Sequence, residues 1–320
     1  MRMYKKLISK IVTAKKLKSE FGFNIAYVSS MASIFHKENK LGRYFTNKKE
    51  KAIKKNIYTV TEDVQKKYKN ICEKKYRIQM DSKIWVFWWQ GIDNAPELVK
   101  LCIESIKKNL DNHELIIIDK NNLEKYINLP DYIYQKFNKG EMCTANFADI
   151  IRVALLAEYG GIWLDATIFM TSPFNDEFYN YEFCSNKRKN QPTSLLYPAK
   201  CRWGTYFLAS GKENLLFKYV RDVFYEYWKY HDMCIDYGMI DFVIDLAYDN
   251  NEKVRKMMDE APYYGEKIHY LLPLLNDVYN VEEYKEIIAE NNIHKLSYKV
   301  KLKDEINGLQ TFYGYIKGKK

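Results

Sequence analysis

Two pairs of polar residues in the middle of the chain have the types and the spacing to carry out chemistry. Asp149 and Arg152 lie three residues apart, and Asp165 and Thr167 lie two residues apart. Both pairs sit in otherwise apolar segments, where an unpaired carboxylate costs several kcal/mol to bury. A cost of that size predicts that these side chains form part of a functional site.

Asp165 and Thr167 offer oxygen ligands. A single strand over residues 162–170 would place both side chains on one face, about 7 Å apart. A carboxylate and a hydroxyl at that spacing can hold a hard divalent cation, Mn²⁺ or Mg²⁺, partly through water. His294, in the stretch 293-IHKLSYK-299, could complete the metal shell, although a lone histidine more often has a structural role.

The element that carries Asp149 and Arg152 is predicted to be a buried helix over residues 146–161. Its residues are apolar almost all round, Asn146 can serve as the N-cap, and two glycines end it. Asp149 alone could complete that cap, and Arg152 could simply pair with Asp149 as a buried ion pair. The two together, just before a strand that contains an aspartate, favour a functional site.

The segments upstream predict an α/β fold. Residues 84–91 and 114–119 are near-continuous apolar runs, and residues 97–110 between them have one apolar helical face. This order is typical of a buried parallel sheet, whose ligands bind beyond the carboxyl ends of the strands. No glycine-rich dinucleotide motif or P-loop is present. Four residues are therefore expected near a site of another kind: Trp88, Trp89, Gln90 and Asp119.

The run 148-ADIIRVALLAEYGGIWLDAT-167 resembles the core motif of glycosyltransferases with a GT-A fold and an Asp-x-Asp motif. The similarity is greatest to the capsular polysaccharide synthesis type, which is related to the Och1-like sugar-binding-region transferases. Five residues fill the positions of that pattern: Asp149, Arg152, Gly160, Gly161 and Asp165.

The resemblance implies roles for these residues. Asp149 and Arg152 would contact the donor sugar, Asp165 would hold the nucleotide ribose and the metal, and Gly161, four residues earlier, would also lie at the nucleotide. Asp241, within a helix that begins near residue 236, would face the donor sugar or the acceptor, unless it lies on an exposed helix face. The usual second acid of the motif is replaced by a threonine, which puts direct metal chelation by two carboxylates in doubt.

The resemblance implies that residues 81–320 form a GT-A domain with a Rossmann-like mixed sheet flanked by helices. The lysine content and helical spacing of residues 1–80 predict a separate basic helical N-terminal region. Either Trp88 or Trp89 could stack on a uracil ring or fill the core.

The activity implied is the transfer of a hexose from a nucleotide-diphosphate sugar, a UDP-sugar, to a lipid-linked saccharide. The reaction would belong to capsular or surface polysaccharide synthesis and would retain the anomeric configuration. A second hypothesis is a related protein that binds carbohydrate or nucleotide without catalysis, because the second acid is missing.

The positive charge is concentrated at the N-terminal end. Residues 1–80 hold 21 Lys and Arg against 6 Asp and Glu, whereas the other 240 residues hold 30 against 35. A basic amphipathic helix over residues 1–18 predicts peripheral contact with an anionic membrane surface; the alternative is a helix that packs on its own domain. We expect no nucleic-acid partner; a protein that binds nucleic acid through this basic arm is the least favoured hypothesis, because the charge is segregated and no recognised module is present.

The same region lacks the features of a signal peptide, because lysines interrupt every apolar run. No segment is apolar enough over about 20 residues to predict a membrane span. The six cysteines are scattered, which is typical of free thiols in a reducing compartment. We therefore expect a cytoplasmic protein, peripheral on the inner face of the membrane.

Overall fold

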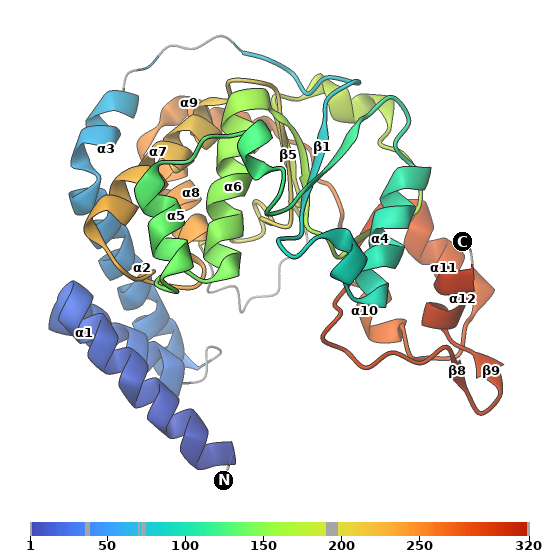
Figure 1. The fold of residues 1–320 in the computed structure, drawn as a ribbon, viewed down its shortest axis with the longest axis horizontal. Coiled ribbons are helices and arrows are strands. Elements are labelled where there is room, and N and C mark those ends of the chain that lie inside the picture. Colours follow the sequence, from blue (N-terminus) through green and yellow to red (C-terminus); the bar gives the residue numbers. More distant parts are fainter. Residues whose placement is uncertain (1, 36–38, 70, 72–74, 190–197, 319–320) are drawn as a thin grey trace.

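A mixed five-stranded sheet organises the computed structural model, which describes residues 2–35, 39–69, 71, 75–189 and 198–318 (Figure 1). Its strand order is β2-β1-β3-β6-β5. β1 pairs in parallel with β2 and β3, whereas β6 pairs antiparallel with β3 and β5. The strands are β1 (Ile84–Phe87), β2 (Leu115–Ile118), β3 (Gly161–Leu164), β5 (Phe183–Ser185) and β6 (Phe207–Ser210).

Both faces of the sheet are covered by helices, as side-chain alternation along the strands requires. Trp85 and Trp163 point into the core formed with α6 (Thr144–Tyr159) and α7 (Leu215–Tyr230). The intervening residues of the same strands point into a second core, formed with α4 (Glu97–Lys108). The predicted class, an α/β mixed sheet flanked by helices with a helical N-terminal extension, is confirmed.

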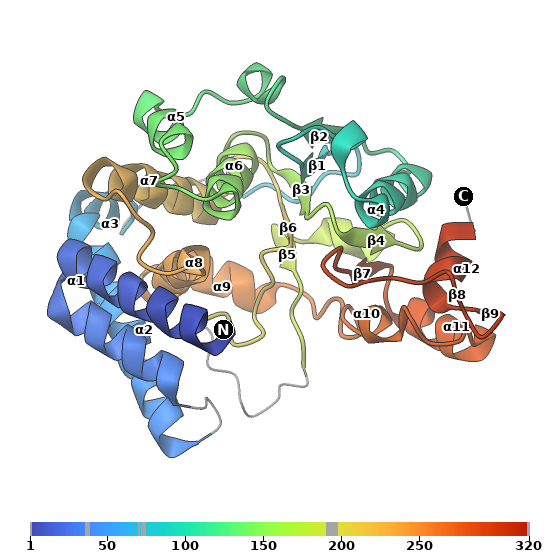
Figure 2. The same cartoon turned by 60° about the horizontal axis from the view of Figure 1, so that its bottom comes forward.

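The N-terminal extension consists of α1 (Arg2–Ile34), α2 (Lys40–Val60) and α3 (Glu62–Tyr68), which lie along one flank of the molecule (Figures 1 and 2). Apolar residues of all three helices share the core of α6, α7 and α8 (Met239–Asn250). Ile53 and Ile57 of α2 are fully buried there.

Lysines of this extension pair with aspartates of the rest of the chain. Lys49 pairs with Asp236, just ahead of α8, and Lys54 pairs with Asp245 and Asp249 of α8. Part of the basic surplus thus meets an acidic helix of the same protein. On α1, Ile8, Ile11 and Val12 are exposed, while the side chains of residues 1–7 and 9 lie outside the described part.

The C-terminal segments gather at the opposite end of the molecule (Figure 2). Strand β7 (Ile293–Lys295) pairs antiparallel with β4 (Ile168–Met170), so that Lys295 faces Ile168 in the register. The remaining elements are α5 (Asp131–Asn138), α9 (Glu252–Glu260), α10 (Leu271–Leu274), α11 (Val281–Glu290), α12 (Phe312–Gly318), β8 (Glu305–Ile306), β9 (Leu309–Gln310) and three short 3₁₀ helices at Ile92–Asn94, Leu123–Lys125 and Asp176–Asn180.

Two local predictions were wrong. Residues 162–170 are not one strand, because the chain turns at residues 165–167 and passes from β3 to β4 in another sheet. The amide of Ile168 donates to the Asp165 carbonyl at 2.8 Å and so closes this turn. Helix α6 begins at Thr144 and has Cys143 as its N-cap residue, so Asn146 is not the cap but accepts a hydrogen bond from the Cys143 thiol.

The two glycines after α6 are explained by close backbone packing. Gly160 and Gly161 have φ values of 66° and 95°, which other residues rarely adopt. A Cβ on Gly161 would lie 2.5 Å from the carbonyl oxygen of Lys83 on the neighbouring chain segment. The glycines therefore end α6, as predicted, and let β3 enter the sheet beside β1.

Candidate active site

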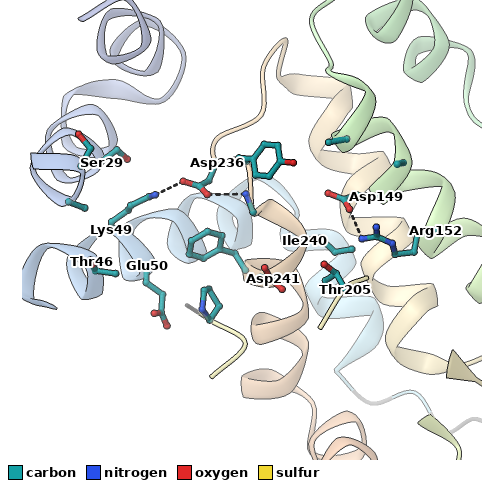
Figure 3. A pocket seen from close by; sticks show the side chains of 18 of the residues that line it. Ser29, Thr46, Lys49, Glu50, Asp149, Arg152, Thr205, Asp236, Ile240 and Asp241 are labelled. Atoms are coloured by element: carbon teal, nitrogen blue, oxygen red, sulfur yellow. Dashed lines mark hydrogen bonds and ion pairs between the residues drawn. The ribbon is translucent and has the colours of Figure 1, made fainter. Parts of the chain in front are cut away.

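A pocket of about 740 Å³ opens where β3 ends and α6 begins, and α1, α2 and α8 complete its walls (Figure 3). The sheet edge supplies Asp165, α6 supplies Asp149 and Arg152, and α8 supplies Asp241. The structure thus brings together four residues that the sequence singled out. The N-terminal helices also contribute, which the sequence did not predict: Ser29, Ala32, Ser33, Thr46, Lys49 and Glu50.

Arg152 connects the two predicted aspartates. Its Nη1 donates to Asp149 Oδ1 at 2.7 Å and its Nη2 donates to Asp165 Oδ1 at 3.0 Å. The guanidinium also lies over the Trp163 ring, 4.9 Å from its centroid, and Trp163 Nε1 donates to Asp165 Oδ1 at 3.1 Å. These contacts hold Arg152 by charge and by stacking, as a planar guanidinium allows.

The two aspartates differ in protonation. Burial would raise the pKa of Asp165, but the charges of Lys295 and Arg152 outweigh it and lower the pKa to about 2. Burial raises the pKa of Asp149 to about 7, since Arg152 offsets only part of the cost and the nearby Asp241 and Asp165 charges add to it. One guanidinium shared by two carboxylates cannot fully neutralise both.

Asp241 lies in the first turn of α8 and is oriented by a tryptophan. Trp203 Nε1 donates to Asp241 Oδ1 at 2.7 Å, and burial raises the pKa of the Asp241 carboxyl. Asp241 therefore lies inside the pocket wall and not on an exposed helix face. Asp236 is not the cap of α8, whose N-cap is Gly238; its carboxylate accepts from the Gly238 amide and pairs with Lys49.

Lys295 is a further residue that the sequence did not predict, and it contacts Asp165 directly. Its Nζ donates to Asp165 Oδ2 at 2.7 Å and to Thr167 Oγ1 at 2.8 Å. Lys295 is the residue after His294 in the stretch 293-IHKLSYK-299, for which the sequence predicted only a role of the histidine. Only the pairing of β7 with β4 shows that the lysine faces the turn.

The residues predicted to bind a divalent metal do not fit that role. The lysine ammonium lies between Asp165 and Thr167, where the cation would have to bind. His294 lies apart from both, with Nε2 3.5 Å from Thr171 Oγ1, and burial lowers its pKa to about 4. Within the described residues, no cluster of three or more His, Cys, Asp or Glu side chains could hold a metal ion.

The residues predicted at the ends of β1 and β2 divide between core and surface. Trp89 packs against Phe137 and Phe147 in the core, whereas Trp88 is half-buried against Tyr298. Gln90 is exposed and Asp119 is half-buried. Gly161 is fixed by its packing on Lys83 and lies within β3.

The sequence profile of the family described as "Capsular polysaccharide synthesis protein" matches residues 33–316. The chain belongs to that family. The matched range covers the sheet, α2 and every predicted site residue, so Asp149, Arg152 and Asp165 all lie within it.

Relatives of this family member include three fungal proteins named as glycosyltransferases. "Probable glycosyltransferase FCK3" of Fusarium pseudograminearum is 24% identical over 55% of this chain and 48% of its own length. "O-glycosyltransferase braB" of Annulohypoxylon truncatum is 27% identical over 33% of this chain and 27% of its own. "Glycosyltransferase afumC" of Aspergillus fumigatus is 23% identical over 45% of this chain and 40% of its own length. The chain thus matches about half or less of the length of these relatives.

A solved structure named "PaToxG Glycosyltransferase" aligns with 77% of this family member and 98% of its own chain. The identity is 15% and the TM-score 0.40, a value that does not establish a shared fold. In the described part of the chain, no helix combines the length and the apolar character that a membrane crossing requires.

Proposed function

We propose that the protein is a GT-A-type glycosyltransferase that moves a hexose from a nucleotide-diphosphate sugar to a saccharide acceptor. One observation carries this proposal: the chain of contacts Asp149–Arg152–Asp165 at the floor of a pocket beyond the carboxyl end of β3. Family membership and the names of the relatives support it.

The pocket suits a hexose because sugars present hydroxyl groups, which donate to carboxylates and accept from a guanidinium. Asp149, Asp241 and Arg152 supply both kinds of partner within one cavity. Held in this way, the anomeric carbon would be oriented toward the acceptor, and fixed orientation is itself a large contribution to rate.

The chemical step exchanges one oxygen for another at the anomeric carbon. The bond from this carbon to the diphosphate oxygen breaks, and its electron pair stays on the diphosphate. The acceptor hydroxyl oxygen bonds to the same carbon, and its proton passes to the departing diphosphate oxygen. Attack from the face that the diphosphate leaves retains the configuration, and no separate nucleophile is then required.

The nucleotide would lie beyond the ends of β1 and β2, where ligands of such sheets bind. Trp88 is half-buried and its Nε1 has no hydrogen-bond partner among the described residues. Its ring contacts the Tyr298 ring edge to face, and we propose that the exposed part of the Trp88 ring stacks on a uracil, with Asp119 near the ribose. These features favour a UDP-sugar as the donor.

The acceptor would enter past the N-terminal helices, since α1 and α2 form one wall of the pocket. We propose a lipid-linked saccharide at the cytoplasmic face of an anionic membrane, because exposed Ile8, Ile11 and Val12 alternate with lysines on α1. Replacing the three by serine should abolish sedimentation with phosphatidylglycerol vesicles and leave the melting temperature unchanged. Unchanged sedimentation would remove the membrane contact from the proposal.

Donor turnover tests the activity. UDP release from a panel of UDP-hexoses should occur with the wild type and fall at least about 100-fold in Asp165→Asn. The matched control is Asp63→Asn in α3, whose side chain is 96% exposed and does not line the pocket. Binding of a UDP-sugar without release by any acceptor or by water would instead support the alternative of a binding protein without catalysis.

A further inference from the structure

Both carboxylate oxygens of Asp165 contact positive charge, and one of the two cations, Lys295, is not among the residues that line the pocket. Lys295 donates to Oδ2 of this carboxylate, while Arg152 and Trp163 donate to Oδ1. One carboxylate therefore has two cations in direct contact. Lys295 uses two of its three ammonium protons on Asp165 and Thr167, and its side chain is 22% exposed, so that one donor remains for a ligand.

A second cation nearby has no carboxylate partner. Arg188 is half-buried, and its Nη2 donates to the Cys201 sulfur at 3.1 Å. Its Nε has no hydrogen-bond partner, and no Asp or Glu among the described residues forms an ion pair with it. A half-buried guanidinium without a counter-charge is costly, and that cost is removed when an anion binds.

Lys295 and Arg188 both lie near Tyr206 and His269. Lys295 Nζ lies 5.5 Å from the centroid of the Tyr206 ring, and Tyr206 Oη lies 3.0 Å from His269 Nε2. Burial, and after it the charges of Arg188 and Lys295, lower the pKa of His269, which is thereby kept neutral near pH 7. Tyr206 and His269 thus lie close to both cations: Lys295 is near the Tyr206 ring, and Tyr206 Oη donates to Asn186 Oδ1 at 2.7 Å, two residues before Arg188.

We propose that Lys295 and Arg188 bind the diphosphate of the donor in place of a divalent metal ion. Together they carry the two positive charges that Mn²⁺ or Mg²⁺ would supply. This inference rests on the proposed transferase function and adds to it that the reaction is independent of metal. When the sugar–oxygen bond breaks, the electron pair arrives on a diphosphate oxygen next to the ammonium and the guanidinium, which stabilise the added charge.

Binding of UDP in the presence of EDTA tests the inference without requiring turnover. Calorimetric titration of the full chain should give the same dissociation constant, within about twofold, with EDTA and with Mn²⁺. Binding that appears only with Mn²⁺ would overturn the inference, and so would no UDP binding under either condition.

Two variants assign the cations. Lys295→Met and Arg188→Met should each raise the dissociation constant of UDP about 30-fold or more, as expected when one partner of a close charge contact is removed. Lys299→Met, an exposed lysine four residues from Lys295, is the control and should bind UDP like the wild type. Arg188→Met leaves no carboxylate unpaired, so it remains informative if Lys295→Met fails to fold. Unchanged binding in Arg188→Met and Lys295→Met would contradict the proposal.

Comparing UDP binding with UDP release distinguishes a failure of the two-cation site from a failure of the proposed transferase activity. UDP that binds in EDTA, with no release of UDP from any UDP-hexose, would support the two-cation site and overturn the proposed activity. UDP release that requires Mn²⁺ would support the transferase activity and overturn the two-cation site.

Discussion

The two sides of Asp165 differ in charge although they share one carboxylate. The pocket is lined by the acids Asp149, Asp236 and Asp241 together with Arg152 and Lys49, whereas Lys295, which donates to the same Asp165 carboxylate, and Arg188 are not among its lining residues. A neutral sugar with many hydroxyls suits the first environment, and a diphosphate suits the second. For the donor proposed above, charge would favour the sugar in the pocket and the diphosphate beside Lys295 and Arg188.

The same comparison explains why two aspartates that bind one arginine titrate so far apart. Asp165 has a second cation, which keeps its pKa at about 2, whereas Asp149 has none and rises to about 7. Burial is the main cause of the raised pKa of Asp149, whereas at Asp165 the charge of Lys295 on β7, with Arg152 and the Trp163 hydrogen bond, outweighs burial.

Loss of Arg152 should have the largest effect, because this residue joins the two sides. Arg152→Met leaves Asp149 and Asp165 without their shared partner in a buried site, and we expect about 3–5 kcal/mol of lost stability. UDP release should fall below detection. Denaturant unfolding and a turnover assay measure these effects, and Arg152→Lys, which keeps the charge, should recover part of the stability. If Arg152→Met were as stable as the wild type, Arg152 would not be the partner that Asp149 and Asp165 depend on.

The second-largest effect is expected for the pH dependence of the free energy of unfolding, because the pKa of Asp149 is raised. Its folded pKa of about 7 lies above the unfolded value, so folding takes up a proton between these two pKa values. The free energy of unfolding should therefore fall by up to about 1.4 kcal/mol per pH unit from this group as the pH rises from 4 to 7. Unfolding midpoints at pH 5 and pH 7 measure it, and Asp149→Asn should remove the dependence. Equal slopes in both proteins would show that Asp149 is ionised throughout.

Asp241→Asn separates the sugar side from the diphosphate side. The asparagine carbonyl can still accept from Trp203 Nε1, so the fold should persist. We expect about tenfold weaker binding of a UDP-hexose, the loss of one charge-assisted contact, and unchanged binding of UDP alone. Calorimetry with both ligands provides the test. A parallel loss for UDP would mean that the two sides are not distinct.

The smallest effect is expected for the ion pair that links α2 to the pocket rim. Lys49 and Asp236 are 24% and 22% exposed, so solvent screens their interaction. Lys49→Ala should cost about 0.5–1 kcal/mol of stability, less in high salt. Chemical unfolding at 0.1 M and 1 M NaCl measures this. A loss well above that range would show that α2 is held to α8 mainly by this pair.

The sequence predicted those parts of the fold and the site that depend on local patterns. Near-continuous apolar runs predicted the strands at 84–91 and 114–119. A single apolar helical face predicted the helix at 97–110. The cluster of Asp149, Arg152 and Asp165 followed from a motif within 17 residues of chain.

What escaped prediction depends on contacts between distant segments. The break between β3 and β4 exists because β4 pairs with β7, more than 120 residues later, and not with the main sheet. Lys295 reaches Asp165 through the same pairing. The basic surplus of the first 80 residues suggested an external anion, but charge counts cannot reveal that α8 supplies acidic partners.

The order of the strands has a consequence for the synthesis of the chain. β3 occupies the middle of the sheet, yet its antiparallel neighbour β6 is translated more than 40 residues after it. Until Phe207–Ser210 have left the ribosome, the apolar Gly161–Leu164 segment has an open edge, and such edges recruit other chains. Chaperone binding in this interval would protect the nascent protein, and truncated forms for expression need to extend beyond β6.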